Sequence, residues 1–217
     1  MRAMIVGLLA ITSALPAIAE PLELEYSTLY SHTKKLDKDE LSALQFAFGF
    51  MHHQSKKMCH IESAYLHTQK MDIPIEVTQE QRFTVPSEKA LRLAKAVARF
   101  ELTEPVNLCD MSVQLETKPE YLKSSYDLAE LKMLHEQYAE FFDSMGSFLS
   151  FMMPSVQGLV LHFPEQTQST VRVDDRLEPT LRIENGELRL DKEWLDSASA
   201  QRLAFGAKPY RITAITK

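Results

Sequence analysis

Short runs in which apolar and polar residues alternate lie on both sides of one long stretch with helical spacing. Residues 44–50 carry phenylalanine at every second position from Phe46. Leu41, Leu44 and Phe48 also fit helical spacing, but the aromatic density and Gly49 favour a strand. Further strands are predicted at 59–65, 73–78, 81–85, 96–102 and 106–115 and, beyond the long stretch, at 158–163, 170–173, 181–183, 187–190 and 211–215.

The long stretch, residues 117–153, predicts an amphipathic helix. Thr117 and Glu120 form a capping box, and Pro119 between them suits the first turn of a helix. Apolar residues then recur three and four positions apart as far as Pro154, which ends the pattern. Because Gly146 allows a bend, two helices in place of one are the alternative.

A shorter helix is predicted at 26–35, and the following Asp37 and Glu40 resemble a second capping box. Asn185-Gly186 between alternating segments predicts a two-residue hairpin turn. A polar stretch at 52–57 predicts a hairpin connection into the strand that carries Cys59.

Residues 83–88 resemble residues 188–193, and a similar order of short segments follows each copy. Two similar β-modules explain this similarity, and chance likeness between short strands is the alternative. We therefore predict an α+β fold of antiparallel β-modules with a long amphipathic helical segment between them. We expect residues 20–217 to form a single domain, which is β-rich at 20–116, helical at 117–153 and β-rich again at 154–217.

The first nineteen residues have the order of a cleavable signal peptide. Arg2 precedes an apolar run at 3–15, and Ala17-Ile18-Ala19 provides small residues before the expected cut. The run is too short to span a bilayer, and a buried N-terminal helix is the alternative. Removing Arg2 with the leader changes the formal net charge from −6 to −7. We expect an exported chain with no transmembrane segment after cleavage.

The chain has two cysteines, Cys59 and Cys109. An even count in an exported chain favours a disulfide, and both residues lie on the apolar side of alternating segments. We therefore predict a structural bridge between them, which closes a loop of about 50 residues. A redox-active pair would be expected to have C-x-x-C spacing, which is missing here.

Three histidines, His52, His53 and His60, lie near Met51 and Met58, and together these are ligand types for copper or zinc. The opposing interpretation is a solvated hairpin tip, because a bridged Cys59 cannot bind metal. We predict no metal site and no cofactor. His135-Glu136 begins like a zinc-protease helix, but Ala139 stands where the second histidine would be needed. We therefore expect His135 and Glu136 to be exposed helix residues.

The apolar stripe of the long helix has two interpretations. It lines a groove for a lipid or hydrophobic peptide, or it covers a sheet, which we favour. The groove residues would be Tyr138, Phe141, Phe142, Met145 and Phe148.

Other catalytic motifs are missing from the sequence, including the G-x-S-x-G elbow, the P-loop and the glycine-rich dinucleotide turn. The mildly acidic charge argues against nucleic acid and anionic lipid as partners.

Residues 24–30, 59–64, 83–86 and 107–110 resemble a catalogued family of unknown function, number 2987, of small exported gamma-proteobacterial proteins. The resemblance implies a leader, a paired-cysteine core and a periplasmic location, with full secretion as the alternative. It supplies no catalytic residue. We expect a non-enzymatic binding or interaction module whose partner is an envelope protein or a hydrophobic ligand. The alternative is an envelope hydrolase whose catalytic residues come together only on folding.

Overall fold

The computed structural model describes residues 21–145, 155–164, 170–198 and 201–217. The α+β fold predicted from the sequence is confirmed: antiparallel sheets dominate, and one long helix lies between the two groups of sheets. The predicted signal peptide lies outside the described residues. None of the helices in the described part of the chain combines the length and the hydrophobicity of a membrane-spanning segment.

The first half of the chain, residues 22–117, contains seven strands and two α-helices. In order they are β1 (Leu22–Glu25), α1 (Tyr26–Thr33), β2 (Leu44–His52), β3 (Ile61–His67), β4 (Asp72–Pro74), β5 (Arg82–Phe83), α2 (Lys89–Leu93), β6 (Val97–Leu102) and β7 (Cys109–Thr117). They form a four-stranded sheet with the order β1-β6-β3-β4 and a three-stranded sheet with the order β5-β2-β7.

The second half, residues 125–216, repeats this topology. Its described elements are β8 (Ser125–Asp127), α3 (Leu128–Met145), β9 (Val156–His162), β10 (Thr170–Val173), β11 (Arg176–Arg182), β12 (Glu187–Asp191), α4 (Lys192–Ser197), β13 (Arg202–Ala204) and β14 (Arg211–Thr216). Its sheets have the orders β8-β13-β10-β11 and β12-β9-β14, which match those of the first half strand for strand. The similar sequences 83–88 and 188–193 fall at equivalent places, where β5 leads to α2 and β12 to α4.

The equivalence of the two halves extends to the strand register. In the first half, Phe48 of the central strand β2 lies opposite Phe83 and Val113. In the second half, Leu161 of β9 lies opposite Leu188 and Ile212. These positions face the apolar core, because side chains alternate between the two faces of a strand. Both three-stranded sheets therefore bury one face by the same pattern.

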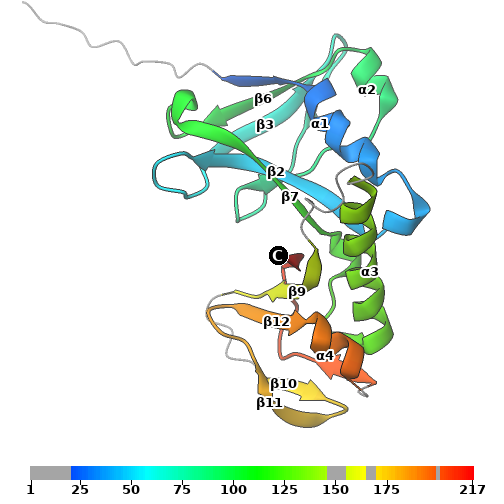
Figure 1. Ribbon diagram of the computed structural model, residues 1–217. Coiled ribbons are helices and arrows are strands. Elements are labelled where there is room, and N and C mark those ends of the chain that lie inside the picture. Colours follow the sequence, from blue (N-terminus) through cyan, green and yellow to red (C-terminus); the bar gives the residue numbers. More distant parts are fainter. Residues whose placement is uncertain (1–20, 146–154, 165–169, 199–200) are drawn as a thin grey trace, which may run out of the picture.

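The two halves join along β7 and β14, and α3 extends along one side of the molecule past the level where they meet (Figure 1). The hydroxyl of Tyr138 in α3 donates a hydrogen bond to the Ile212 carbonyl at 2.7 Å and accepts one from the Thr117 hydroxyl at 3.1 Å. The amide of Ala43 donates to Oε1 of Gln137, also in α3, at 2.8 Å. The long helix thus holds the last strand of each half through polar contacts in the core.

The predicted start of the long helix is wrong. Thr117 ends β7 opposite Leu44, and its hydroxyl is used by Tyr138. The proline-containing sequence after it forms only a 3₁₀ turn, Pro119–Tyr121, and the helix begins at Leu128. The expected capping box at Asp37 is also wrong, because a 3₁₀ turn at Asp39–Leu41 has no side-chain cap. Residues 146–153 of the predicted helix lie outside the described residues.

The predicted turn at Asn185-Gly186 is confirmed. Both residues have positive φ, 52° and 77°, and the amides of Glu184 and Glu187 each donate to the other's carbonyl at 2.9 Å. The expected hairpin does not extend beyond this single bridge, because the turn connects β11 to β12, which belong to different sheets. The turn therefore leads the chain from the four-stranded sheet of the second half to its three-stranded sheet.

Candidate functional site

Polar residues line the face of each three-stranded sheet that lies opposite the apolar core. On the β5-β2-β7 sheet, Gly49 of β2 lies between Arg82 and Ser112. At the equivalent row of the β12-β9-β14 sheet, His162 lies between Glu187 and Arg211. The two sheets therefore place different side chains at equivalent strand positions.

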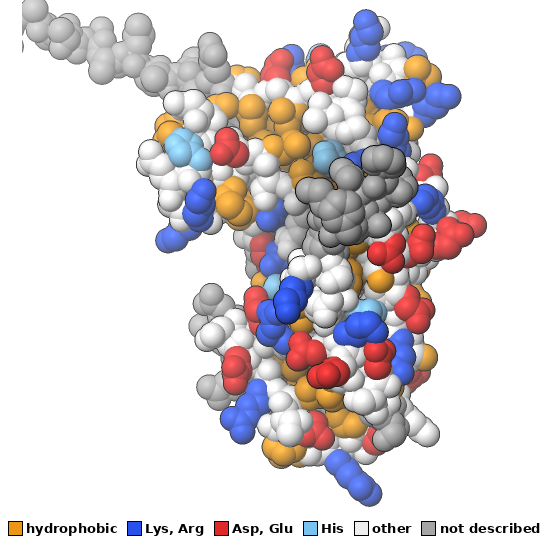
Figure 2. Space-filling view, in the orientation of Figure 1, with side chains coloured by type: hydrophobic (Ala, Val, Ile, Leu, Met, Phe, Trp, Pro, Cys, Tyr) orange, Lys and Arg blue, Asp and Glu red, His pale blue; other side chains and the backbone are white. Residues whose placement is uncertain are grey.

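A hollow of about 520 Å³ lies against the first of these rows and is lined from both halves of the chain. Figure 2 shows the molecule narrowing at the level where the two halves meet, with basic, acidic and histidine side chains gathered there. The volume of the hollow is within the range of small-molecule sites. The lining residues are Met51, Met58, Gln79, Glu80, Gln81, Arg82, Gln114 and Arg211.

Gly49 allows the wall of this hollow to form. A Cβ atom at this position would lie 2.5 Å from Cε of Met58 and 2.7 Å from the carbonyl oxygen of Gln81. These two segments can close over the sheet only because residue 49 has no side chain. Met58 also forms a β-bridge with Met51, so the two methionines lie on neighbouring chain segments at one side of the hollow.

The Arg82 guanidinium reaches along the floor of the hollow. Its Nη1 donates to the Ser112 hydroxyl at 3.1 Å and to the Ser112 carbonyl at 3.4 Å. Burial, followed by the charge of Arg211, lowers the pKa of Arg82, and the charge of Glu116 opposes this shift. Arginine nevertheless stays protonated in proteins. Two cations from different halves are thus brought close enough to affect each other.

Arg211 occupies the junction between the halves. Its Nε is buried and has no hydrogen-bond partner among the described residues. Its guanidinium carbon lies 5.4 Å from the ring centroid of Tyr210. Across the described ranges, neither Arg82 nor Arg211 forms an ion pair with a carboxylate within 4 Å.

Glu116 lies on the same face of β7 as Ser112, opposite Gln45. One of its carboxylate oxygens accepts a hydrogen bond from Nε2 of Gln45 at 2.9 Å. Burial raises the pKa of Glu116, while this hydrogen bond and the charges of Arg211 and Arg82 oppose the shift. The carboxylate is therefore close enough to act on both arginines without pairing with either.

In the second half, His162 lies between the Glu187 carboxylate of the equivalent row and the hydroxyl of Thr213, which is two residues beyond Arg211 on β14. Nε2 of His162 lies 3.0 Å from the Thr213 hydroxyl, and its Nδ1 lies 3.4 Å from Oε1 of Glu187. Burial, with smaller contributions from Arg211 and Arg189, lowers the pKa of His162 to about 4. The imidazole is consequently neutral at pH 7. The Thr213 side chain is 8% exposed, so its hydroxyl is largely covered.

The predicted disulfide between Cys59 and Cys109 is confirmed. It joins the start of β7 to the segment directly after Met58, and the Cys59 amide donates to the Phe50 carbonyl at 2.8 Å. Cys59 lies just before β3 and not within a strand as expected. The bridge thereby fixes the segment that forms one wall of the hollow.

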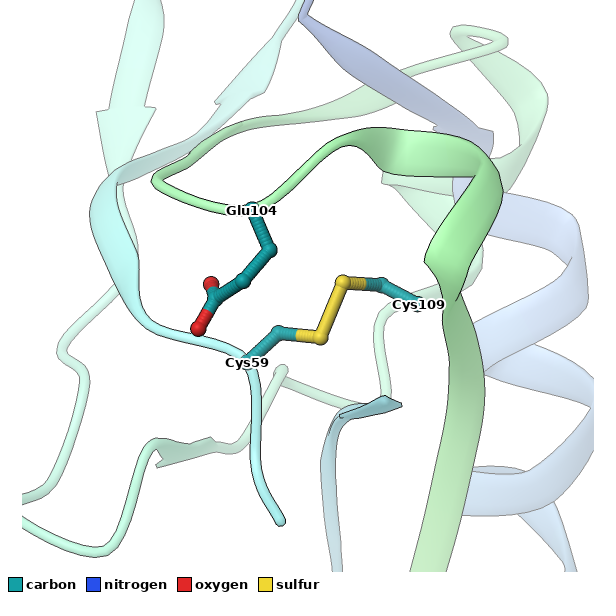
Figure 3. Close-up of side chains that lie close together, drawn as sticks. All are labelled: Cys59, Glu104 and Cys109. Carbon is teal, nitrogen blue, oxygen red and sulfur yellow. A yellow bond between two sulfur atoms is a disulfide. The ribbon is translucent and has the colours of Figure 1, made fainter. Parts of the chain in front are cut away.

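The described residues contain one group of three side chains with metal-ligand spacing: Cys59, Glu104 and Cys109 (Figure 3). Both sulfur atoms belong to the disulfide, and a Glu104 oxygen accepts a hydrogen bond from the His60 amide at 2.8 Å. This donor set does not suit a metal ion, because a disulfide sulfur is not a thiolate.

The three histidines proposed as weak metal ligands lie around the 52–57 turn. The rings of His52 and His53 stack with centroids 5.7 Å apart, and Nδ1 of His52 accepts from the amides of Gln54 and Ser55. His60, directly after Cys59, is exposed. The structure does not group these three imidazoles into one cluster with other ligand types.

The predicted groove residues of α3 have different surroundings. Tyr138 and Phe141 are buried in the core, Phe142 is half-buried and Met145 is exposed. Phe148 lies outside the described residues. The groove therefore stays a prediction, and of its described residues Phe142 and Met145 are accessible. His135 is half-buried, in contrast to the exposed position expected, and Glu136 is exposed.

The arginines of the hollow were not predicted from the sequence. Arg82 lies in a predicted strand and Arg211 begins another, and each is an isolated basic residue in its segment. The similarity between residues 83–88 and 188–193, which are offset by 105 residues, was the one sequence feature that indicated equivalent rows. It could not show that these rows meet at one junction.

A family model with the description "Protein of unknown function (DUF2987)" matches residues 18–163, which include the whole first half together with α3 and β9. No curated protein and no solved structure matches the chain.

Proposed function

The chain belongs to the DUF2987 family of proteins of unknown function, and from the geometry of the hollow we propose that it is a non-enzymatic binding module of the periplasm. Its ligand would occupy the hollow between the two halves. The observation that carries this proposal is the convergence of Arg82 and Arg211, one from each half, on one opening of about 520 Å³.

The shape of the hollow favours binding of a small molecule. Ligand sites combine an apolar wall with a few charged or polar groups that fix orientation. Met51 and Met58 supply such a wall, while Gln81, Arg82 and Gln114 supply polar groups. The disulfide and the strand framework hold these groups in position without a ligand, which lowers the entropic cost of binding.

The periplasmic location is part of the proposal. A disulfide is stable in oxidising compartments, and residues 1–19 have the order of a leader. Fractionation of cells together with the intact mass of the native protein tests this part. A periplasmic species that begins near Glu20 supports it, whereas a cytoplasmic species that retains Met1 contradicts it.

Binding is tested with a panel of small molecules and the mature chain, residues 20–217. The panel contains neutral sugars, amines, carboxylates, phosphates and apolar amides, and thermal unfolding reports which classes stabilise the fold. Gln114→Trp fills the hollow and should abolish the stabilisation. Gln157→Trp, on β9 away from the hollow, is the matched control. Stabilisation by no class, or equal loss in both variants, overturns the proposed function.

A hydrolase is the second candidate, favoured by the order of Thr213, His162 and Glu187. A neutral imidazole beside a hydroxyl is the arrangement of a general base and a nucleophile. Binding is the better-supported function because the Thr213 hydroxyl is largely covered. Hydrolysis of p-nitrophenyl acetate that is lost in both Thr213→Val and His162→Gln would support the hydrolase. Equal rates in wild type and variants would rule it out.

A further inference from the structure

We infer that the hollow binds a small organic acid, whose carboxylate or phosphate group lies between Arg82 and Arg211 and whose apolar part contacts Met51 and Met58. This inference rests on the proposed function and names the ligand class for the same site. It is carried by three features of the hollow: its charge, its unused hydrogen-bond donors and its apolar wall.

The charge of the lining favours an anion. Three charged side chains line the hollow, namely Arg82, Arg211 and Glu80, so the lining carries a formal charge of +1. Two guanidiniums near one another in a partly buried place repel each other, and neither has a carboxylate within 4 Å in the described part of the chain. An oxyanion between them would replace this repulsion with two attractions.

The hydrogen-bond donors of the two arginines are only partly used. Within the described residues, the hydrogen bonds of Arg82 come from Nη1 alone and go to Ser112, while Nε of Arg211 is buried with no partner. Buried donors normally find an acceptor. Carboxylate and phosphate oxygens fit the planar fork of a guanidinium, which can donate two parallel hydrogen bonds.

Besides Glu80, which lines the hollow and is already counted in its charge, Glu116 opposes anion binding. It lies beside the two arginines on the face of β7, held by Gln45, and it does not line the hollow itself. Its negative charge attracts both guanidiniums and would repel a bound acid. Removing that charge should therefore strengthen binding. We therefore expect Glu116→Gln to increase the affinity of the hollow for the acid.

The apolar wall selects acids that carry a short hydrocarbon part. Met51 and Met58 form a β-bridge at one side of the hollow, and the methyl end of Met58 lies over Gly49. Methionine side chains adapt their shape to varied apolar groups. The combination of this wall with two guanidiniums suits an amphiphilic acid better than inorganic phosphate.

The experiment is calorimetric titration of the mature chain with hexanoate, hexyl phosphate, inorganic phosphate and hexanamide. Hexanoate or hexyl phosphate should bind at least about tenfold more tightly than hexanamide, as expected for charge-assisted hydrogen bonds. If hexanoate binds more tightly, the natural ligand is a carboxylate, and if hexyl phosphate binds more tightly, it is a phosphate. Binding of inorganic phosphate as tight as that of hexyl phosphate would exclude a role for the methionine wall.

Substitutions of the two arginines and of Glu116 test whether the acid binds in the hollow. Arg82→Gln and Arg211→Gln should each weaken acid binding about tenfold, and Glu116→Gln should strengthen it about threefold. Arg189→Gln is the control, because Arg189 is an exposed arginine of β12 that does not line the hollow. Circular dichroism reports folding, and Arg82→Lys and Arg211→Lys serve if a glutamine variant fails to fold. The lysine variants should weaken binding because they lack the planar fork.

Equal binding of hexanoate and hexanamide, or an equal effect of the control variant, overturns the acid site. If neutral sugars or amines in the broader panel still bind and Gln114→Trp abolishes that binding, the proposed function survives and only this inference fails. If nothing in either experiment binds, both fail together.

Discussion

The disulfide offers the most quantitative test of how this fold is held together. Cys59 and Cys109 are 50 residues apart in sequence, and the closed loop contains β3, β4, β5, α2 and β6. The double variant Cys59→Ala/Cys109→Ala removes the link. Alanine is the better replacement because Cys59 is fully buried, and serine would place an additional hydroxyl in the core.

The magnitude follows from chain entropy. Closing a loop of this length restricts the unfolded chain and stabilises the folded state by about 4 kcal/mol. For a mature chain of this size, that loss corresponds to a decrease in Tm of roughly 8–16 °C. Because the bridge also fixes the segment next to Met58, binding in the hollow should weaken in the same variant.

The assay is urea denaturation followed by circular dichroism, with the wild type measured oxidised and after reduction. The reduced wild type should match the double variant, since both lack the same link. A difference of less than about 1 kcal/mol between oxidised and reduced wild type would refute the reasoning, because the loop would then have little freedom to lose.

Three further predictions concern packing and pH. Tyr138→Phe leaves the buried partners of its hydroxyl in both halves unsatisfied and should cost about 1–3 kcal/mol by urea denaturation; no change would contradict the role of α3 as the connection. Gly49→Ala should destabilise the fold by about 1–3 kcal/mol and weaken ligand binding, since its Cβ would collide with Met58, and unaltered stability in the same assay would be inconsistent with the close approach. His162 has a folded pKa of about 4 against an unfolded value near 6.5, so the unfolded chain takes up the proton first as pH falls through this window. The free energy of unfolding should therefore fall by about 3 kcal/mol between pH 7 and pH 4, and His162→Gln should remove that part of the slope; an unchanged slope in the variant would rule out His162 as its source.

The sequence predicted the elements whose pattern is local. The strands at 44–50 and 96–102, the turn at Asn185-Gly186 and the disulfide all follow from alternation, backbone preference or residue count. The start of the long helix did not follow, because Thr117 is held in β7 by its partner Leu44 and by Tyr138, both distant in sequence. A local capping pattern has no information about such partners.

The candidate site depends on contacts that no single sequence shows. Arg82 and Arg211 are 129 residues apart (211 − 82) and meet only because equivalent sheets join along β7 and β14. The faint similarity between 83–88 and 188–193 indicated equivalent elements. It contained no information on how the halves pack. Short elements such as β13 and α4 were likewise missed, since three to six residues give too little periodicity.

The central claim is that a ligand binds between the two halves of the chain. Amide chemical-shift mapping of the ¹⁵N-labelled mature protein during titration with hexanoate tests it directly. We predict that the largest shifts occur at Met58, Gln81, Arg82, Gln114 and Arg211, from both halves at once. Shifts confined to one half, or centred on the exposed end of α3 near Met145, would contradict it.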